Sequence, residues 1–304
     1  MTTDALYRAV QACYEGWSGR YHDEYYGDAA PYPPVHVDLI RDLLRASRPA
    51  TLLDAGCGPA TVLRALDDLA GDRFGFDLTP AMVDEARRVL APQNVPDSHV
   101  WCGNVVDAAA FRCPDPSAPP TFDATLCIGV LPHIPADRDD TVLDHLCASV
   151  SSGGRLIVEA RNALFALFTF NRYTRAFVTD ALLRLDARRA AADATTRAML
   201  DDVESDLASL VRDDLPPRRR GDDAGAGYDD ILSRTHNPFE LAAACRARGL
   251  RDVEVLFYHY HALPPMFESR APAYFRELSL AMEDPRDWRG HVMASAFLVT
   301  GVAP

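Results

Sequence analysis

Five short apolar runs alternate with amphipathic stretches between residues 51 and 160. This pattern limits the possible folds more than any other feature of the sequence. Strands that alternate with helices build a parallel sheet with helices packed on its faces. The sequence therefore predicts an α/β fold. The predicted strands are TLLDA (51–55), RFGFDL (73–78), SHVWCG (98–103), FDATLCIG (122–129) and GRLIVEA (154–160), and the main helical patterns are ATVLRALDDLA, TPAMVDEARRVL and ADRDDTVLDHLCASV.

Two local signals predict where these helices begin and end. Thr79 precedes Pro80, which is the order of an N-cap followed by proline at the first helical position. Gly153 and Gly154 follow the third helical pattern. Because glycine commonly follows the last turn of a helix, we expect this pair to end it.

After residue 160 the alternation stops. An aromatic stretch, LFALFTFNRYTRAF, precedes a long helical pattern with leucine or valine at every third or fourth position from Leu200 to Leu210. The segment 213–230 is rich in proline, glycine and charge, as exposed loops are. A further helix ending at Gly249 and two apolar strands follow. The predicted organisation is an N-terminal helical cap (1–50), a core (51–160), a helical insertion (161–235) and the completion of the core (236–304).

The charge balance argues against nucleic acid as a partner. The chain of 304 residues has 44 acidic and 31 basic side chains, which gives a formal net charge of −13. Nucleic acids are bound by basic surfaces, so a polyanion-binding protein of this composition is disfavoured. Every basic residue is arginine. Without lysine the chain can form neither a Schiff base nor the lysine contact of a P-loop.

The seven cysteines favour a reducing compartment. Their number is odd and no C-x-x-C pair occurs, so we predict free thiols and a cytoplasmic protein. The N-terminal sequence MTTDALYRAVQACYEGW lacks a basic region followed by an apolar stretch, and LFALFTF is too short to span a bilayer. We expect neither secretion nor membrane insertion, and no pattern indicates an oligomeric state.

The segment LLDAGCGPATVLRAL (52–66) has the features of a ligand-binding turn. Asp54 ends a strand, and Gly56 and Gly58 lie between that strand and a helix, where glycines let a ligand approach the backbone. Asp77 ends the next strand, where a doubly wound sheet presents a carboxylate to ribose hydroxyls, although such an acid can also simply cap the following helix. A dinucleotide site would have a third glycine where Thr61 stands. This departure favours S-adenosylmethionine.

Four segments in succession resemble the motifs of the class I S-adenosylmethionine-dependent methyltransferases, the Rossmann-like methyltransferase superfamily. They are DAGCG, FGFDLTPAMVDEAR, WCGNVVDAAAF and FDATLCIGVLPHIP, and SSGGRLIVEARN is similar to the strand that follows them. The resemblance implies a doubly wound, mainly parallel seven-stranded sheet, an enzyme that transfers a methyl group, and S-adenosylmethionine as cofactor. It also implies that Asp77 binds the ribose and that Met82 lines the adenine. The full set of cofactor residues that it implies is Asp54, Gly56, Gly58, Asp77, Leu78, Met82, Asn104, Val105 and Cys127.

The N-terminal string YEGWSGRYHDEYYG resembles the aromatic-rich leading helices that close over the cofactor in this family. Trp17 and Tyr21 are therefore candidates for a cover of the cofactor. Aromatic rings also pack in protein cores, so the alternative is that these two residues seal an edge of the sheet.

Two histidines are candidates for a general base, which methyl transfer needs when the acceptor is a hydroxyl or a protonated amine. His133 follows the fourth predicted strand, at the end of the sheet where acceptors bind. If it is the base, the rate should fall below a pKa near that of free histidine, roughly 6–7. His236 is the second candidate. The alternatives are a backbone-bonded turn histidine for His133 and a buttress of the following helix for His236.

A metal site is disfavoured. His259 and His261 are two residues apart on a predicted strand, hence on one face, but nothing supplies an obvious third ligand. Metal-dependent catechol-type methyltransferases place an acid at the end of the fourth strand, where this chain has Gly129.

The acceptor is expected to be a small molecule, including those of secondary metabolism, methylated on oxygen or nitrogen. The Asn/Asp-Pro-Pro-aromatic motif of adenine methylation and the Pro-Cys pair of cytosine methylation are missing. The aromatic insertion would cover the acceptor or, alternatively, form only a hydrophobic core of its own. Two other functions stay open: an NAD(P)-dependent oxidoreductase, and a non-catalytic module that binds S-adenosylmethionine.

Overall fold

A computed structural model describes residues 3–16, 26, 32–221 and 228–304. The chain divides into two compact units. The first consists of Met1–Arg161, Arg219–Leu256 and Ala296–Pro304, and the second of Asn162–Arg218 and Phe257–Ser295. The first unit therefore contains every segment in which the sequence predicts a cofactor motif.

Seven strands within the described residues form one sheet in the order β3-β2-β1-β4-β5-β7-β6. Strands β1 to β5 pair in parallel, and β7 runs antiparallel to β5. The expected α/β fold with a mainly parallel seven-stranded sheet is confirmed. The strands are β1 (Thr51–Ala55), β2 (Asp72–Asp77), β3 (Val100–Cys102), β4 (Phe122–Cys127), β5 (Val150–Arg161), β6 (Arg251–Tyr260) and β7 (Ala294–Val302).

The central strands are apolar because both of their faces are covered. Leu52 and Leu53 of β1 and Leu126 of β4 are fully buried, which is the pattern of a strand with helices on both sides. The rings of Phe74 on β2 and Phe122 on β4 pack with their centroids 5.3 Å apart. This packing joins the faces of β2 and β4 in the core.

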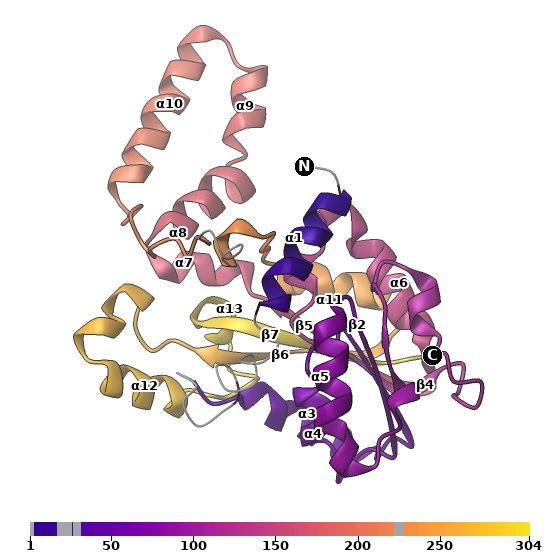
Figure 1. Ribbon diagram of the computed structural model, residues 1–304. Coiled ribbons are helices and arrows are strands. Elements are labelled where there is room, and N and C mark those ends of the chain that lie inside the picture. Colours follow the sequence, from indigo (N-terminus) through magenta and orange to yellow (C-terminus); the bar gives the residue numbers. More distant parts are fainter. Residues whose placement is uncertain (1–2, 17–25, 27–31, 222–227) are drawn as a thin grey trace. The chain divides into compact units, whose positions relative to one another are not determined.

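Helices cover both faces of the sheet in the first unit (Figure 1). The chain winds from β1 through α4 to β2 and through α5 to β3, whereas α6 leads from β4 to β5 in the opposite direction along the sheet. Because such crossovers are right-handed, α4 and α5 lie on one face and α6 on the other. The winding reverses between β1 and β4, where open α/β sheets have their ligand crevice. These helices are α1 (Thr3–Glu15), α3 (Val35–Arg45), α4 (Thr61–Ala65), α5 (Pro80–Leu90), α6 (Asp139–Ser149) and α11 (Pro238–Ala247).

The expected end of one helix was wrong. Helix α6 ends at Ser149, and Gly153 and Gly154 lie inside β5. The pairing of β4 with β5 shifts register here, and Gly153 has a φ of 76°. A Cβ at Gly154 would lie 2.7 Å from the carbonyl oxygen of Asp123. The glycines therefore serve the irregular start of a strand, not the end of a helix.

The second unit is helical apart from the strand ends that it shares with the sheet, and it follows β5, as the sequence predicts for the insertion. Its helices are α7 (Ala166–Thr169), α8 (Arg172–Ala176), a π-helical segment (Phe177–Leu182), α9 (Leu185–Ala191), α10 (Ala194–Ser209), α12 (Pro272–Ala281) and α13 (Gly290–Met293). Asn162 explains why two distant segments form one unit. Its side-chain amide donates to the carbonyl oxygens of His291 (2.9 Å) and Ala294 (2.8 Å).

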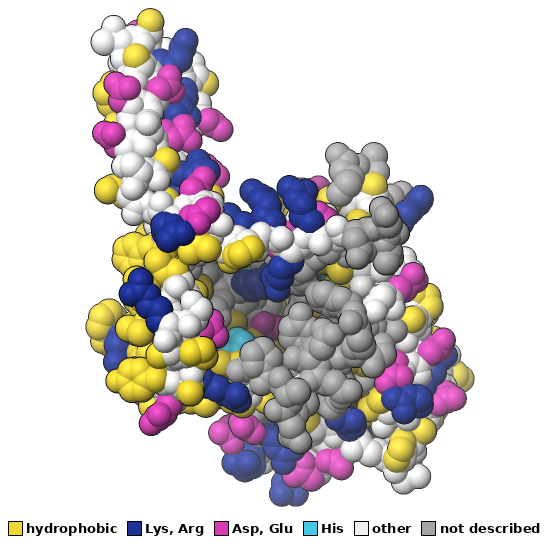
Figure 2. All heavy atoms as spheres, turned by 60° about the vertical axis from the view of Figure 1, so that its left-hand side comes forward, with side chains coloured by type: hydrophobic (Ala, Val, Ile, Leu, Met, Phe, Trp, Pro, Cys, Tyr) yellow, Lys and Arg dark blue, Asp and Glu magenta, His cyan; other side chains and the backbone are white. Residues whose placement is uncertain are grey.

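Charged side chains hold together the hairpin of α9 and α10. Arg189 of α9 pairs with Asp201 (2.8 Å) and with Glu204 of α10. Figure 2 shows arginine and acidic side chains interspersed over this hairpin. Within the described part of the chain, none of the helices combines the length and the apolar character needed to cross a membrane.

Candidate functional site

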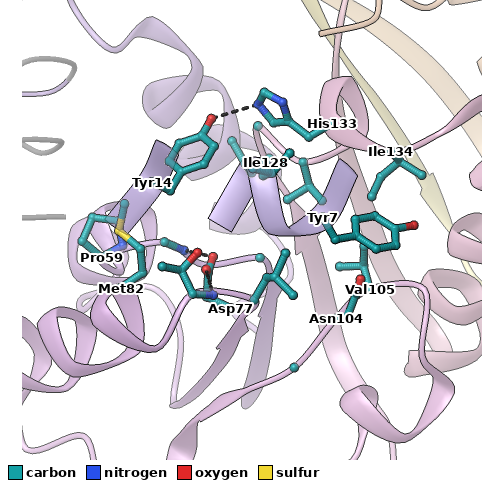
Figure 3. Close-up of a pocket in the computed structure, with 18 residues that line it drawn as sticks. Tyr7, Tyr14, Pro59, Asp77, Met82, Asn104, Val105, Ile128, His133 and Ile134 are labelled. Atoms are coloured by element: carbon teal, nitrogen blue, oxygen red, sulfur yellow. Dashed lines mark hydrogen bonds between the residues drawn. The ribbon is translucent and has the colours of Figure 1, made fainter. Parts of the chain in front are cut away.

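A pocket lies at the reversal of winding in the first unit (Figure 3). The loops after β1, β2, β3 and β4 form its walls, and α1 forms a further wall. Its volume is about 700 Å³ including the open mouth, within the range of small-ligand sites. The lining residues are Tyr7, Val10, Tyr14, Gly56, Gly58, Pro59, Asp77, Leu78, Thr79, Met82, Gly103, Asn104, Val105, Ile128, Gly129, Val130, His133 and Ile134.

Gly56 and Gly58 turn the chain from β1 into α4, as the sequence predicts. The backbone N–H groups of Gly56 and Cys57 both donate to the carbonyl oxygen of Phe76, at 2.8 and 2.9 Å, which ties the turn to β2. Gly56 and Gly58 have φ values of 85° and 52°, the left-handed region that favours glycine. A Cβ on Gly58 would meet no atom within 4 Å. The space beside Gly58 is therefore part of the pocket.

Asp77 binds the same turn through its carboxylate. One oxygen accepts the N–H of Gly58 (2.9 Å) and the other accepts the N–H of Thr79 (2.8 Å). Burial raises the pKa of this carboxyl, and the two backbone N–H groups oppose the shift. Asp77 thus does bind the start of α5, the alternative that the sequence left open, while still lining the pocket. Each oxygen keeps a lone pair for a ligand hydroxyl.

Asp54 lies behind the turn and does not line the pocket. Its side chain is 2% exposed, and its Oδ1 accepts no hydrogen bond from the described residues. Burial, with a smaller contribution from Asp77, raises the pKa of Asp54 to about 7. A carboxylate oxygen buried without a partner is unfavourable, so a positive charge nearby would stabilise the ionised form of Asp54.

The predicted adenine side of the site is mostly apolar. Leu78, Met82 and Val105 line the pocket there, together with Asn104. The side-chain oxygen of Asn104 accepts the N–H of Val106 at 3.2 Å, which leaves its amide group as a donor. Cys127 is fully buried in β4 and does not line the pocket.

His133 lies in the pocket wall, in a short 3₁₀ helix (Leu131–His133) after β4. Its Nε2 is 2.9 Å from the hydroxyl of Tyr14, and its Nδ1 is 2.7 Å from the carbonyl oxygen of Leu232. The side chain is 6% exposed. Burial lowers its pKa to about 4, below the value of roughly 6–7 expected for an exposed histidine. His133 is therefore neutral near neutral pH.

Residues 231–236 lie where the chain leaves the insertion 161–235, and we call them the exit segment. They bind along the turn that carries His133. Ile231 packs against Val10 and Cys13 of α1, and the N–H of Arg234 donates to the carbonyl oxygen of Pro132 at 2.8 Å. The guanidinium of Arg234 pairs with Asp139 through two bonds of 2.9 and 2.8 Å. The exit segment therefore fixes both His133 and the helix that carries Tyr14.

His236, the second candidate base, does not line the pocket. It is 8% exposed, and its Nε2 lies 3.5 Å from the carboxylate of Asp139. Its backbone N–H donates to the carbonyl oxygen of Arg161 at 2.8 Å. Asn237 then caps α11. This placement resembles the buttress that the sequence offered as the alternative for His236.

Three lining residues of α1 were missed by the sequence interpretation. Tyr7, Val10 and Tyr14 line the pocket, and their spacing of three and four residues places them on one helix face. That stripe is the signal that could have found them. Trp17 and Tyr21, the residues predicted instead, lie outside the described residues.

No group of three potential metal-binding side chains occurs among the residues that the structure describes. His259 has a φ of 62°, and β6 ends at Tyr260. The simple alternation that would put His259 and His261 on one strand face is therefore broken.

Comparison with known proteins gives one family profile and several similar solved structures. The family profile described as "Methyltransferase domain" matches residues 52–154. No curated protein matches the chain. The structure is similar to DhpI in its complex with S-adenosylhomocysteine (SAH), with a TM-score of 0.52 and 15% identity over 99% of this chain and 98% of that one. A second DhpI structure, the DhpI-SAM-HEP complex, has a TM-score of 0.52 and 16% identity over 100% of both chains.

Another similar structure is the N-methyltransferase NodS from Bradyrhizobium japonicum WM9 in complex with SAH. Its TM-score is 0.52, with 11% identity over 97% of this chain and 99% of that one. The chain spans only 55% of the length of an O-methyltransferase family protein from Burkholderia thailandensis, at 16% identity, 88% coverage of this chain and a TM-score of 0.45. At such identities the likeness shows the fold. The profile match shows that residues 52–154 resemble a methyltransferase domain, and the structural likeness shows that the chain has the fold of these proteins.

Proposed function

We propose that this protein transfers the methyl group of S-adenosylmethionine to an oxygen or nitrogen atom of a small, uncharged acceptor. The observation that carries the proposal is the pairing of Asp77 with Gly58 at the reversal of winding. It places a carboxylate beside an open stretch of backbone, which suits a ligand with ribose hydroxyls. The dinucleotide alternative is disfavoured because Thr61, buried in the first turn of α4, stands where a third glycine would be.

The residues present fit the cofactor. Asp77 would bind the ribose hydroxyls, and Leu78, Met82 and Val105 would contact the adenine. Gly56 and Gly58 allow the close approach of the backbone, and the buried charge of Asp54 would favour the cationic part of the molecule. The bound cofactor supplies an electrophilic methyl group on a sulfonium. The protein then has to hold the acceptor in line with that group.

The acceptor side of the pocket supports an uncharged substrate. Asp77 is the only aspartate, glutamate, lysine or arginine among the described lining residues, and it belongs to the cofactor side. Val10, Val130 and Ile134 provide apolar contacts near Tyr14 and His133. We also propose that the insertion 161–235 selects the acceptor, because its aromatic residues include Phe170 and Tyr173, which are 48% and 45% exposed.

Calorimetry followed by turnover tests this function. We expect the protein to bind S-adenosylmethionine and SAH but not NAD. Labelled methyl groups should then pass to at least one member of a panel of phenols, alcohols and amines, with release of SAH. Binding of NAD in preference to SAH would contradict the proposal. Tight SAH binding with no turnover on any acceptor would instead favour a non-catalytic binding module.

We expect affinity for S-adenosylmethionine to rise with pH through the pKa of Asp54, which is about 7. The ionised form attracts the cationic ligand, and about one molecule in ten is ionised one pH unit below the pKa, so the dissociation constant at pH 6 should be about tenfold higher than at pH 8. Titration calorimetry at both pH values measures this ratio. In Asp54→Asn the carboxyl no longer titrates, but any titration of the ligand remains. If the dissociation constant of this variant depended on pH as much as that of the wild type, Asp54 would not be the cause.

A further inference from the structure

The hydroxyl of Tyr14 and the ring of His133 are joined in the pocket wall (Figure 3). Both side chains line the pocket, and their rings meet edge to face with centroids 5.5 Å apart and an interplanar angle of 78°. Tyr14 comes from α1 and His133 from the turn after β4. Two elements far apart in the sequence therefore present one hydrogen-bonded pair to the ligand.

The carbonyl of Leu232 fixes the direction of this hydrogen bond. A carbonyl oxygen can only accept, so Nδ1 of His133 must carry the proton that it donates to Leu232. In the neutral ring Nε2 is then unprotonated and accepts the hydroxyl proton of Tyr14. Burial keeps the ring neutral by lowering the pKa of His133 to about 4. The phenol oxygen, with its hydrogen directed to His133, can accept a hydrogen bond from a ligand.

We propose that Tyr14 is the catalytic residue that receives the proton of the methyl acceptor, and that His133 is a positioning residue that acts through Tyr14. The proposal rests on the methyltransferase function proposed above and identifies the acceptor further. The atom to be methylated must carry a hydrogen that it can donate to the phenol oxygen, so the substrate is an alcohol, a phenol or an amine with an N–H.

The proton and electron balance of the step is complete without another reactant. A lone pair of the acceptor atom forms the bond to the methyl carbon while the carbon–sulfur bond breaks and its electron pair stays on sulfur. The acceptor proton moves to the oxygen of Tyr14, and the hydroxyl proton of Tyr14 moves to Nε2 of His133. The resulting imidazolium is held by Leu232 at Nδ1 and later returns its extra proton to solvent.

A second tyrosine–histidine pair in the same unit provides a matched control. The hydroxyl of Tyr26 is 3.1 Å from Nε2 of His36, with ring centroids 5.4 Å apart and an interplanar angle of 68°. Burial lowers the pKa of His36 to about 4 as well. Neither Tyr26 nor His36 lines the pocket. Tyr26→Phe therefore removes the same kind of hydrogen bond at a residue outside the described lining of the pocket.

The kinetic test compares Tyr14→Phe with Tyr26→Phe, using phenol, benzyl alcohol and aniline as acceptors, all of which are uncharged near neutral pH. For the acceptor that the wild type methylates fastest, we expect Tyr14→Phe to lower kcat by about 10² with SAH affinity unchanged. Tyr26→Phe should keep both values within about twofold, a margin of roughly 0.4 kcal/mol. The double variant Tyr14→Phe/His133→Gln should be no slower than Tyr14→Phe, because the two residues act as one unit. A kcat of Tyr14→Phe within threefold of the wild type would overturn the role of Tyr14.

Nitrogen NMR of the SAH complex tests the pair without turnover. The His133 ring should show its proton on Nδ1, and phenol, benzyl alcohol or aniline should shift the Nε2 resonance in the wild type but not in Tyr14→Phe. A proton on Nε2, or no shift with any of the three probes, would overturn the proposal. If the wild type did not bind SAH at all, the proposed function itself would fall, and calorimetry distinguishes that result from a failed role of Tyr14.

Discussion

Asparagine in place of Gly58 should weaken SAH binding by roughly ten- to a hundredfold while the protein stays folded. The φ of 52° at Gly58 lies in the left-handed region, which asparagine adopts more readily than other residues with a Cβ. No protein atom lies within 4 Å of the new Cβ, so the substitution strains little. The side chain would enter the pocket instead, and overpacking of about 1–3 kcal/mol corresponds to that loss of affinity.

Gly153→Asn is the matched control for this substitution. Gly153 has a φ of 76°, and a Cβ there also meets no atom within 4 Å, but Gly153 lies in β5 away from the pocket lining. We expect both variants to unfold at similar temperatures and only Gly58→Asn to lose affinity in calorimetry. Wild-type affinity in Gly58→Asn would show that no ligand group comes near this turn.

Removal of the Asp77 carboxylate should weaken the binding of S-adenosylmethionine and SAH by about ten- to a hundredfold. Charge-assisted hydrogen bonds contribute about 1.5–3 kcal/mol, and 1.4 kcal/mol is a factor of ten in affinity. Asp77→Ala also releases the N–H groups of Gly58 and Thr79, so part of the loss would come from a looser turn. An unchanged dissociation constant in a folded variant would remove Asp77 from the site.

Asp123 offers a control for the structural part of this effect. Its Oδ2 accepts the N–H groups of Ala50 (2.9 Å) and Thr51 (3.1 Å), at the start of β1 and β4 and therefore at the opposite end of the sheet from the pocket. Asp123→Ala loses two backbone contacts, as Asp77→Ala does. We expect a comparable fall in thermal stability in both variants and a change of affinity in Asp77→Ala alone.

Those parts of the site that depend on neighbouring residues in the chain could be predicted from the sequence. Gly56, Gly58 and Asp77 lie where a strand ends, and parallel strands bring their carboxyl ends to one edge of the sheet. The order of apolar runs was therefore enough to place these residues together. The same reasoning placed His133 after β4.

Contacts between segments that are far apart in the chain have no comparable signal in the sequence. The pairing of Tyr14 with His133 depends on how α1 packs, and the contact of Leu232 with His133 uses a backbone carbonyl that every residue possesses. The lowered pKa of His133 follows from burial by these segments, so a value near that of free histidine was expected from the sequence and a value of about 4 results in the fold. Gly153 and Gly154 show the converse problem, because a pair of glycines suits an irregular strand as well as the end of a helix.

The hydrogen bond from His133 to Leu232 makes the tautomer of the His133 ring depend on the path of the chain. Exchange of the Leu232 side chain leaves the carbonyl in place, so a scan of single substitutions would score this position as tolerant. Deletion of one residue just before Ile231 would turn a different peptide unit toward the ring and could reverse its tautomer. The number of residues that lead to position 232 therefore matters for the site in its own right. An alignment that compares only residue types would not detect this constraint.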